Sequence, residues 1–219
     1  GLCMPASDVA VEERPVPSAS VEPVVNDFSI QVSTVNGSGS QTANLVLLRA
    51  IFQMGVPVSG KNMFPSNIAG LPTWFTIRTN KDGYIGWKKK TEVLVAMNPE
   101  TAREDTLNLD ADSMVVYDES LKLDSVRSDL VFYPVPFDSL MGQVSRDVKL
   151  RRRVRNMIYD GVLSQLLGVQ LEQMEVALRR QFGSKPKVVS INREALDVGS
   201  EIGLEGHHDR CEHAGHERS

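Results

Sequence analysis

The spacing of apolar residues predicts alternating strands and helices from about residue 27 to residue 199. Apolar side chains at every second position indicate a first strand at Phe28–Val35, because successive strand side chains point to opposite faces. Spacings of three and four residues indicate amphipathic helices. The further predicted strands are Phe75–Thr79, Tyr84–Trp87, Glu92–Met97, Ser113–Tyr117 and Leu130–Tyr133, and the predicted helices are Thr42–Met54, Glu100–Leu107, Val154–Leu167, Leu171–Phe182 and Ser190–Leu196.

This order of elements predicts the fold class and the domain boundaries. Short apolar strands that alternate with helices favour a Rossmann-like three-layer α/β domain with a mostly parallel sheet, which we place at residues 27–199. Residues 1–26 include Pro15, Pro17 and Pro23 and show no regular period, so we expect a flexible, disordered leader. Residues 200–219 hold all four histidines of the chain and predict a disordered C-terminal tail.

Composition argues against several classes of function. A formal net charge of -4 gives no general attraction to nucleic acid. No apolar run approaches the roughly 20 residues that cross a bilayer, so we expect no membrane span. The only two cysteines, Cys3 and Cys211, lie in the predicted disordered ends, which fits a cytoplasmic protein without a disulfide framework. The predicted folded part has no histidine or cysteine, so we expect no catalytic triad and no catalytic residue in this chain.

The glycine-rich turn between the first strand and the first helix is the strongest local signal. Glycines there allow backbone N–H groups to approach a phosphate, and the helix N-terminus adds a positive dipole. The side chains of Ser38, Ser40 and Gln41 supply further donors beside Gly37 and Gly39. A tight turn that merely packs the helix on the strand is the alternative. The turn lacks the third glycine of a dinucleotide fingerprint, and no acidic residue clearly serves a ribose.

The segment that follows the first helix contains a misleading motif. Gly55–Asn62 matches G-x-x-x-x-G-K, but asparagine stands where a P-loop needs Ser or Thr for magnesium. Lys61 is either a point charge for an anionic ligand or a solvated lysine. Val58–Trp74 is predicted to be a long loop, which either docks a partner or covers the edge of the sheet.

Two further clusters have ordinary explanations. The basic runs Lys149–Arg155 and Lys88–Lys90 contain no aromatic residue for base stacking, so we interpret them as solvated surface. The histidines near Cys211 are residue types that bind zinc, but nothing around them is apolar enough to hold ligands in place. We therefore expect no metal site.

Several motifs together resemble the γ-type N-terminal domain of 2-oxoacid:acceptor oxidoreductase α subunits. The likeness is greatest to 2-oxoglutarate:ferredoxin oxidoreductase and covers about residues 27–199, and the long middle motif is its specific part. The motifs are Gly37–Asn44, Pro57–Ile68, Gly70–Trp74, Met97–Pro99, Arg155–Met157 to Gly161, Leu166–Gly168 and Arg180–Val188.

The resemblance implies a domain that helps to bind coenzyme A in an enzyme that converts a 2-oxoacid oxidatively to acyl-coenzyme A. It suggests Gly37, Ser38, Gly39, Ser40 and Gln41 as the anion site and Lys61 as a charge partner. Thiamine diphosphate, Mg²⁺ and an iron–sulfur cluster are expected on partner subunits or domains only, with ferredoxin as electron acceptor and the middle loop facing the thiamine-bearing domains. The chain alone is expected to be inactive.

One departure from the family pattern leaves the organisation of the chain open. Subunits with this motif set normally continue into a long thiamine-associated domain, so the chain is either a truncated product or a free-standing γ domain. Two other functions also stay open. One is a non-catalytic partner-docking module with no ligand on the turn, and the other is a stand-alone nucleotide-dependent oxidoreductase.

Overall fold

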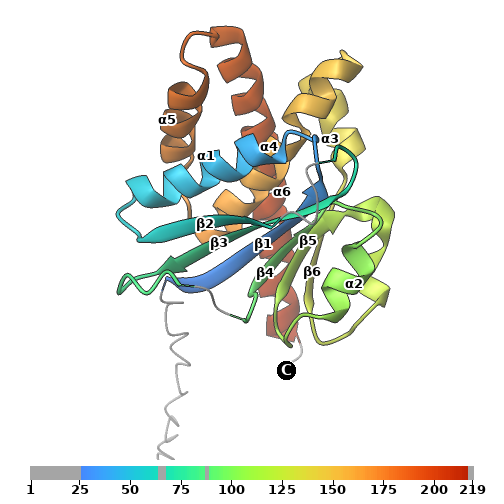
Figure 1. Ribbon diagram of the computed structural model, residues 1–219. Coiled ribbons are helices and arrows are strands. Elements are labelled where there is room, and N and C mark those ends of the chain that lie inside the picture. The colour runs from blue at the N-terminus through green and yellow to red at the C-terminus, as the bar shows by residue number, and fades with distance from the viewer. Residues whose placement is uncertain (1–25, 64–67, 87–88, 217–219) are drawn as a thin grey trace, which may run out of the picture.

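Six strands form one sheet in the order β2-β3-β1-β4-β5-β6 (Figure 1). The computed structural model describes residues 26–63, 68–86 and 89–216. The expected leader lies outside this range except for its last residue, and so does the end of the expected tail, at residues 217–219. The strands are β1 (Asp27–Val35), β2 (Val58–Met63), β3 (Pro72–Asn80), β4 (Val93–Ala96), β5 (Met114–Asp118) and β6 (Val131–Val135).

The sheet is mostly parallel, as predicted. Strands β1, β4, β5 and β6 pair in parallel, whereas β3 is antiparallel to both β1 and β2. The predicted pairing of Phe75–Thr79 with Tyr84–Trp87 is wrong, because β3 finds its partners far away in sequence: Ile77 lies opposite Ile30 on one side and Gly60 on the other. After β3, the side chain of Asn80 accepts hydrogen bonds from the backbone of residues 82 and 84 at 2.9 and 3.0 Å and closes a local turn.

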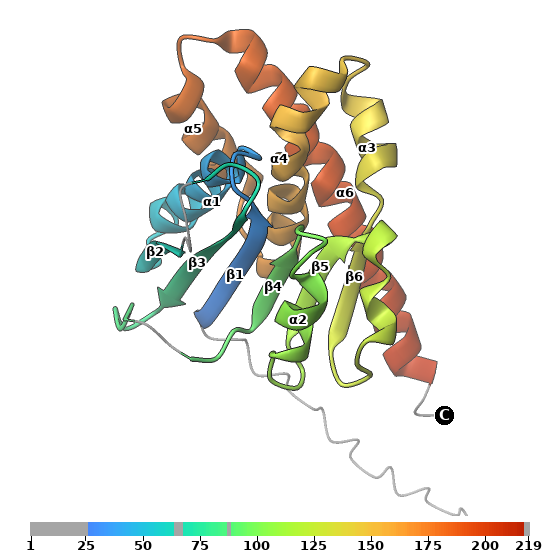
Figure 2. The same ribbon diagram turned by 45° about the vertical axis from the view of Figure 1, so that its right-hand side comes forward.

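Helices cover both faces of the sheet, which confirms the three-layer fold (Figure 2). The strand period divides the core: Val93 and Val95 of β4 pack toward the larger helical layer, and Leu94 and Ala96 pack toward the smaller one. The larger layer consists of α1 (Ser40–Gln53), α3 (Phe137–Val144), α4 (Val148–Leu167), α5 (Leu171–Phe182) and α6 (Pro186–His216), and the smaller one contains α2 (Ala102–Leu107).

Strand β2 and helix α3 also differ from the sequence prediction. The first six residues of the predicted long loop form the edge strand β2, so the motif Gly55–Asn62 runs into a strand and cannot be a P-loop. Backbone pairing with β3 holds this polar stretch in an extended conformation, although its side chains lack the apolar alternation that predicts a strand. Helix α3 was not predicted, because a helix of only eight residues shows little periodicity.

Helices α4 and α6 cross through glycines, and this contact extends the domain beyond residue 199. A Cβ atom at Gly199 would collide with the carbonyl group of Ile158, and one at Gly161 would meet the backbone of α6. Ser200 is only 5% exposed, and Gly203 lies against Gln165. The packing of α6 on α4 thus continues past residue 199, where the sequence predicts the domain to end, and the backbone of α6 is helical through residue 216.

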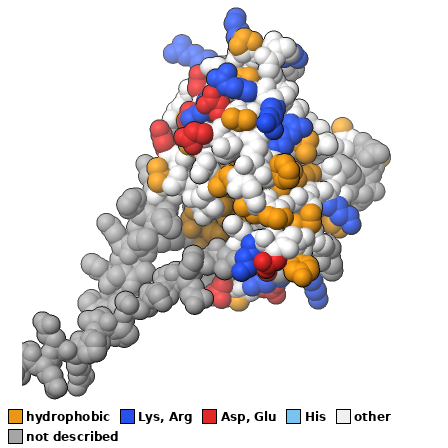
Figure 3. Space-filling model, turned by 90° about the vertical axis from the view of Figure 1, so that its left-hand side faces the viewer, with side chains coloured by type: hydrophobic (Ala, Val, Ile, Leu, Met, Phe, Trp, Pro, Cys, Tyr) orange, Lys and Arg blue, Asp and Glu red, His pale blue; other side chains and the backbone are white. Residues whose placement is uncertain are grey.

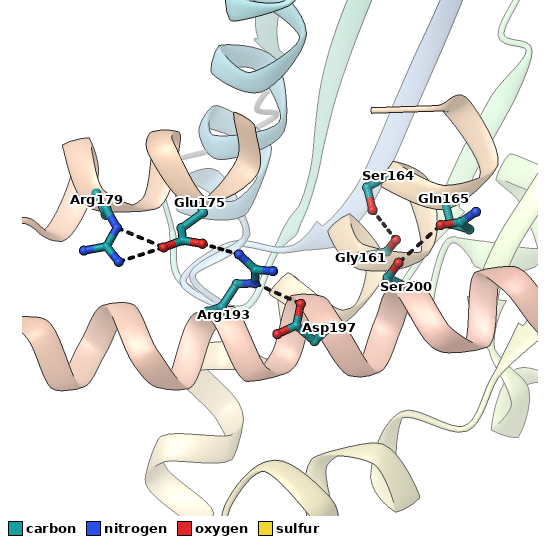
Figure 4. A network of polar contacts seen from close by, with 8 residues as sticks. All are labelled: Gly161, Ser164, Gln165, Glu175, Arg179, Arg193, Asp197 and Ser200. Atoms are coloured by element: carbon teal, nitrogen blue, oxygen red, sulfur yellow. Dashed lines mark hydrogen bonds and ion pairs between the residues drawn. The ribbon is translucent and has the colours of Figure 1, made fainter. Parts of the chain in front are cut away.

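Ion pairs join α5 to α6 beside this crossing (Figure 4). Glu175 of α5 accepts a hydrogen bond from Arg179 at 2.7 Å and pairs with Arg193 of α6, which also donates to Asp197 at 2.8 Å. On the other side of the crossing, the hydroxyl of Ser200 faces Gln165 of α4 (Figure 4). Among the described helices, none is long and apolar enough to cross a membrane.

Candidate functional site

The glycine-rich turn joins the carboxyl end of β1 to the first turn of α1, as predicted. Gly37 and Gly39 have φ angles of 87° and 83°, which lie in the left-handed region that only glycine adopts at little cost. The backbone N–H of Ser38 donates to the carbonyl oxygen of Val35 at 3.1 Å, and α1 starts at Ser40. The backbone N–H of Thr42 already donates to the carbonyl oxygen of Gly39 at 3.2 Å, which leaves the N–H groups of Ser40 and Gln41 at the start of α1 for an anion.

Side chains from β1 and α4 hold this turn in place. The hydroxyls of Thr34 and Ser40 are hydrogen-bonded at 2.8 Å. From α4, the side-chain amide of Asn156 donates to the carbonyl oxygen of Ser38 at 2.9 Å, and the hydroxyl of Tyr159 donates to Asn44 at 2.9 Å. The turn is thereby fixed against the strand that precedes it and against α4, which is distant in sequence, and this preorganises the N–H groups at the start of α1.

A cavity of about 670 Å³ opens beside the turn. Its walls come from residues 35–39, from the N-terminal half of α4, and from the end of α5, the connection that follows it and the first turns of α6. Arg155 and Lys185 are its charged lining residues, and no carboxylate of the described residues lines it. We call it the basic cavity. Its volume lies within the range of about 300–1,000 Å³ that is typical of small-molecule sites.

Arg155 is the residue at this cavity that the sequence analysis misjudged. Its guanidinium forms an ion pair with Asp118, at the carboxyl end of β5, and lies 5.2 Å from the ring centre of Phe137. Its Nε is buried without a hydrogen-bond partner among the described residues. The basic run around it indicated a solvated helix face, but the carboxylate directly after the predicted strand Ser113–Tyr117 was a signal that could have pointed to it.

The structure brings five of the six predicted site residues together and separates the sixth. Gly37, Ser38 and Gly39 line the basic cavity, whereas Ser40 and Gln41 line a smaller cavity of about 310 Å³ between α1 and β2. A Cβ atom at residue 60 would lie 2.7 Å from the ring of Phe75, and residue 62 lines the smaller cavity, so both face α1. Lys61 lies between them on β2 and therefore points to the opposite face of the sheet.

A buried acid lies one helical turn beyond Asn156. Asp160 is fully buried, and neither carboxylate oxygen has a hydrogen-bond partner among the described residues. Burial raises the pKa of this carboxyl well above its usual range. Burial thus favours the neutral form of this carboxyl over its charged form.

The face around the β2 edge of the sheet carries exposed apolar side chains (Figure 3). Orange side chains gather across the middle of this face in Figure 3. The elements on this side include two strongly exposed apolar residues, Phe52 of α1, 66% exposed, and Met63 of β2, 48% exposed. Apolar surface of this kind is typical of contacts with other proteins.

Comparisons with known proteins agree on one family. Residues 29–202 match the sequence profile of the family described as pyruvate ferredoxin/flavodoxin oxidoreductase. The chain is 23% identical to the α subunit of 2-oxoacid:ferredoxin oxidoreductase 1 from Aeropyrum pernix, over 80% of the chain and 34% of that protein. It thus spans about a third of the length of this curated relative.

Solved structures share the fold. The 2-oxoglutarate:ferredoxin oxidoreductase from Magnetococcus marinus, solved with 2-oxoglutarate, coenzyme A and succinyl-CoA bound, superimposes with a TM-score of 0.70 at 22% identity, over 82% of this chain and 31% of the other. The γ subunit of a keto/oxoacid ferredoxin oxidoreductase from Geobacter sulfurreducens gives a TM-score of 0.66 at 18% identity, over 81% of this chain and 99% of the other.

Proposed function

Because the chain belongs to the pyruvate ferredoxin/flavodoxin oxidoreductase family, we propose that it is the coenzyme A-binding and assembly domain of a 2-oxoacid:ferredoxin oxidoreductase. The proposed enzyme is of the 2-oxoglutarate type and converts the 2-oxoacid oxidatively to acyl-coenzyme A. The chain is inactive on its own and acts in the cytoplasm, which its two cysteines favour. The support for the substrate is the resemblance of the motifs at residues 57–74 to 2-oxoglutarate:ferredoxin oxidoreductase, and this fold also superimposes on an enzyme of that name.

The donor set of the basic cavity fits the phosphates of coenzyme A. Backbone N–H groups at a helix N-terminus, together with an arginine and a lysine, are the groups that proteins use for phosphate. The hydroxyl of Ser38 is buried and has no partner among the described residues, and a phosphate oxygen would supply one. The Magnetococcus structure, which contains coenzyme A, supports the same ligand. This combination of turn, cavity and cations carries the proposal.

The residues of this chain bind and orient the ligand in this proposal. Arg155, fixed by Asp118, provides a charge-assisted contact to a phosphate, and the turn N–H groups hold a second one. Coenzyme A, when bound, supplies the thiol that accepts the acyl group. The described residues contain no group of three or more His, Cys, Asp or Glu that could hold a metal ion. We propose thiamine diphosphate, Mg²⁺ and the iron–sulfur cluster for the partner subunits, with ferredoxin as acceptor.

A docking module without a ligand is the competing function, and the exposed apolar side chains at the β2 edge favour it. The two functions separate in the assembled enzyme. Arg155→Ala is expected to raise the KM for coenzyme A while the partner subunits still co-purify, because the arginine lines the cavity. Met63→Glu is expected to weaken co-purification, because it places a charge among exposed apolar groups. Normal coenzyme A kinetics in the Arg155 variant would favour the docking module instead.

A further inference from the structure

A third cavity adjoins the basic cavity at the carboxyl ends of the parallel strands. It has a volume of about 360 Å³ and shares Val35, Ser38, Arg155 and Asn156 with the basic cavity. In open α/β sheets this edge is where ligands bind. Its remaining walls come from the segments after β4 and β5 and from the first turn of α3: Met97, Pro99, Asp118, Ser120, Leu121 and Asp138.

The two cavities have opposite charge. Two carboxylates, Asp118 and Asp138, line the third cavity, which we call the acidic cavity. Arg155 compensates the charge of Asp118, whereas Asp138 is exposed and forms no ion pair among the described residues. The acidic cavity therefore repels a phosphate, while the basic cavity attracts one.

We propose that the acidic cavity binds the uncharged pantetheine arm of coenzyme A, with the phosphates of the same molecule in the basic cavity. This inference rests on the proposed function. All phosphates of coenzyme A lie in its nucleotide half, whereas the arm carries amide N–H groups and hydroxyl groups that donate hydrogen bonds. Asp138 accepts such donors, and Met97, Pro99 and Leu121 pack against the apolar parts of the arm.

The reverse orientation does not fit these charges. The adenosine end of coenzyme A carries a phosphate on its ribose, and this group would face the carboxylate of Asp138. Arg155 lines both cavities and stands between the charged and uncharged parts of the ligand.

The test compares coenzyme A with adenosine 3′,5′-bisphosphate, which lacks the arm, by calorimetric titration of the full chain. Asp138→Ala removes the free acceptor, and Ser120→Trp fills the acidic cavity from an exposed position. Asp138→Ala is expected to weaken coenzyme A binding about tenfold, as the loss of a hydrogen bond to a charged group does, and Ser120→Trp is expected to weaken it by occupying the space of the arm; both leave bisphosphate binding unchanged. Glu119→Ala is the matched control, because this exposed neighbour lines neither cavity.

The outcomes separate the two proposals. If the wild-type chain binds coenzyme A and Arg155→Ala weakens both ligands, but neither acidic-cavity variant discriminates between them, the pantetheine assignment is wrong and the proposed function stands. If the wild-type chain binds neither ligand, both proposals fail. Thermal unfolding of each variant shows whether it is folded.

Discussion

Replacing Gly199 by alanine tests how tightly the α4–α6 crossing holds the site. A Cβ atom there would lie 2.9 Å from the carbonyl carbon of Ile158 and closer still to its oxygen, whereas ordinary contact begins at 3.4 Å. The obstacle is helix backbone, which cannot rotate away as a side chain does. The helices must therefore part by at least roughly half an ångström in a close-packed interior.

Two opposing effects determine how much Gly199→Ala changes the free energy of unfolding. Alanine is favoured over glycine inside a helix by about 1 kcal/mol, which alone would stabilise the protein. Overpacking of a core costs about 1–3 kcal/mol and occasionally more, and a backbone collision belongs at the upper end. We expect Gly199→Ala to lower the free energy of unfolding by about 2 kcal/mol.

Urea unfolding followed by circular dichroism measures this difference, and Gly142→Ala is the matched control. Gly142 lies in α3, where a Cβ atom would meet nothing within 4 Å. That variant is expected to gain up to about 1 kcal/mol from helix propensity. If Gly199→Ala is as stable as Gly142→Ala, the close packing of α4 on α6 is refuted. The crossing bears on function because α4 carries Arg155 and Asn156 to the turn.

Three further predictions concern the turn and the buried acid. Arg155→Ala is expected to weaken coenzyme A binding by tenfold or more in a calorimetric titration, because the arginine lines the basic cavity. Lys61→Ala is expected to leave the affinity unchanged, because Lys61 faces away from the turn. Equal losses of affinity in the two variants would contradict this placement. Gly37→Ala is expected to destabilise the fold by about 1 kcal/mol in urea unfolding, because its φ angle of 87° is strained for alanine; an unchanged midpoint would refute this. At pH 7, Asp160→Asn is expected to unfold at a higher urea concentration than the wild type. At pH 3, where both side chains are neutral, the two urea midpoints are expected to agree. An equal difference in urea midpoint at both pH values would argue against a raised pKa of Asp160.

The direction of this pH effect follows from the raised pKa of Asp160. The unfolded chain ionises this carboxyl at a pKa of about 3.9, whereas the folded chain keeps its proton to higher pH. The stability associated with the protonated group is fully present below about pH 4 and is lost as the pH rises toward the folded-state pKa. Each pKa unit of the difference corresponds to about 1.4 kcal/mol.

The sequence predicted correctly those strands and helices whose conformation is encoded in their own pattern of apolar and polar residues. The alternation in Phe28–Val35 and the spacing in Leu171–Phe182 correspond closely to β1 and α5. The glycine turn was found because a left-handed backbone between strand and helix requires that residue type. β2 could not be found in this way, because its partner is supplied by β3 and its own sequence is polar.

The site was predicted in part for the same reason. The turn is contiguous in sequence, whereas the ion pair between Arg155 and Asp118 joins residues 37 positions apart. A basic run on a helix is ordinarily solvated, and only the packing of α4 against the carboxyl ends of the strands turns one of its arginines toward the cavity. Lys61 was suggested as a charge partner while Val58–Trp74 was predicted to be a loop, and only the pairing of β2 with β3 shows which face of the sheet its side chain takes.

Calorimetric titration of coenzyme A into the purified chain tests the central claim most directly, with dephospho-coenzyme A and NADH as comparators and Gly39→Val as the variant. Gly39 has a φ angle of 83° at the start of α1, so valine there disrupts the turn itself. The account predicts binding that is selective for coenzyme A and abolished in the variant. Binding that survives in Gly39→Val, or equal binding of NADH, would contradict a coenzyme A site on this turn.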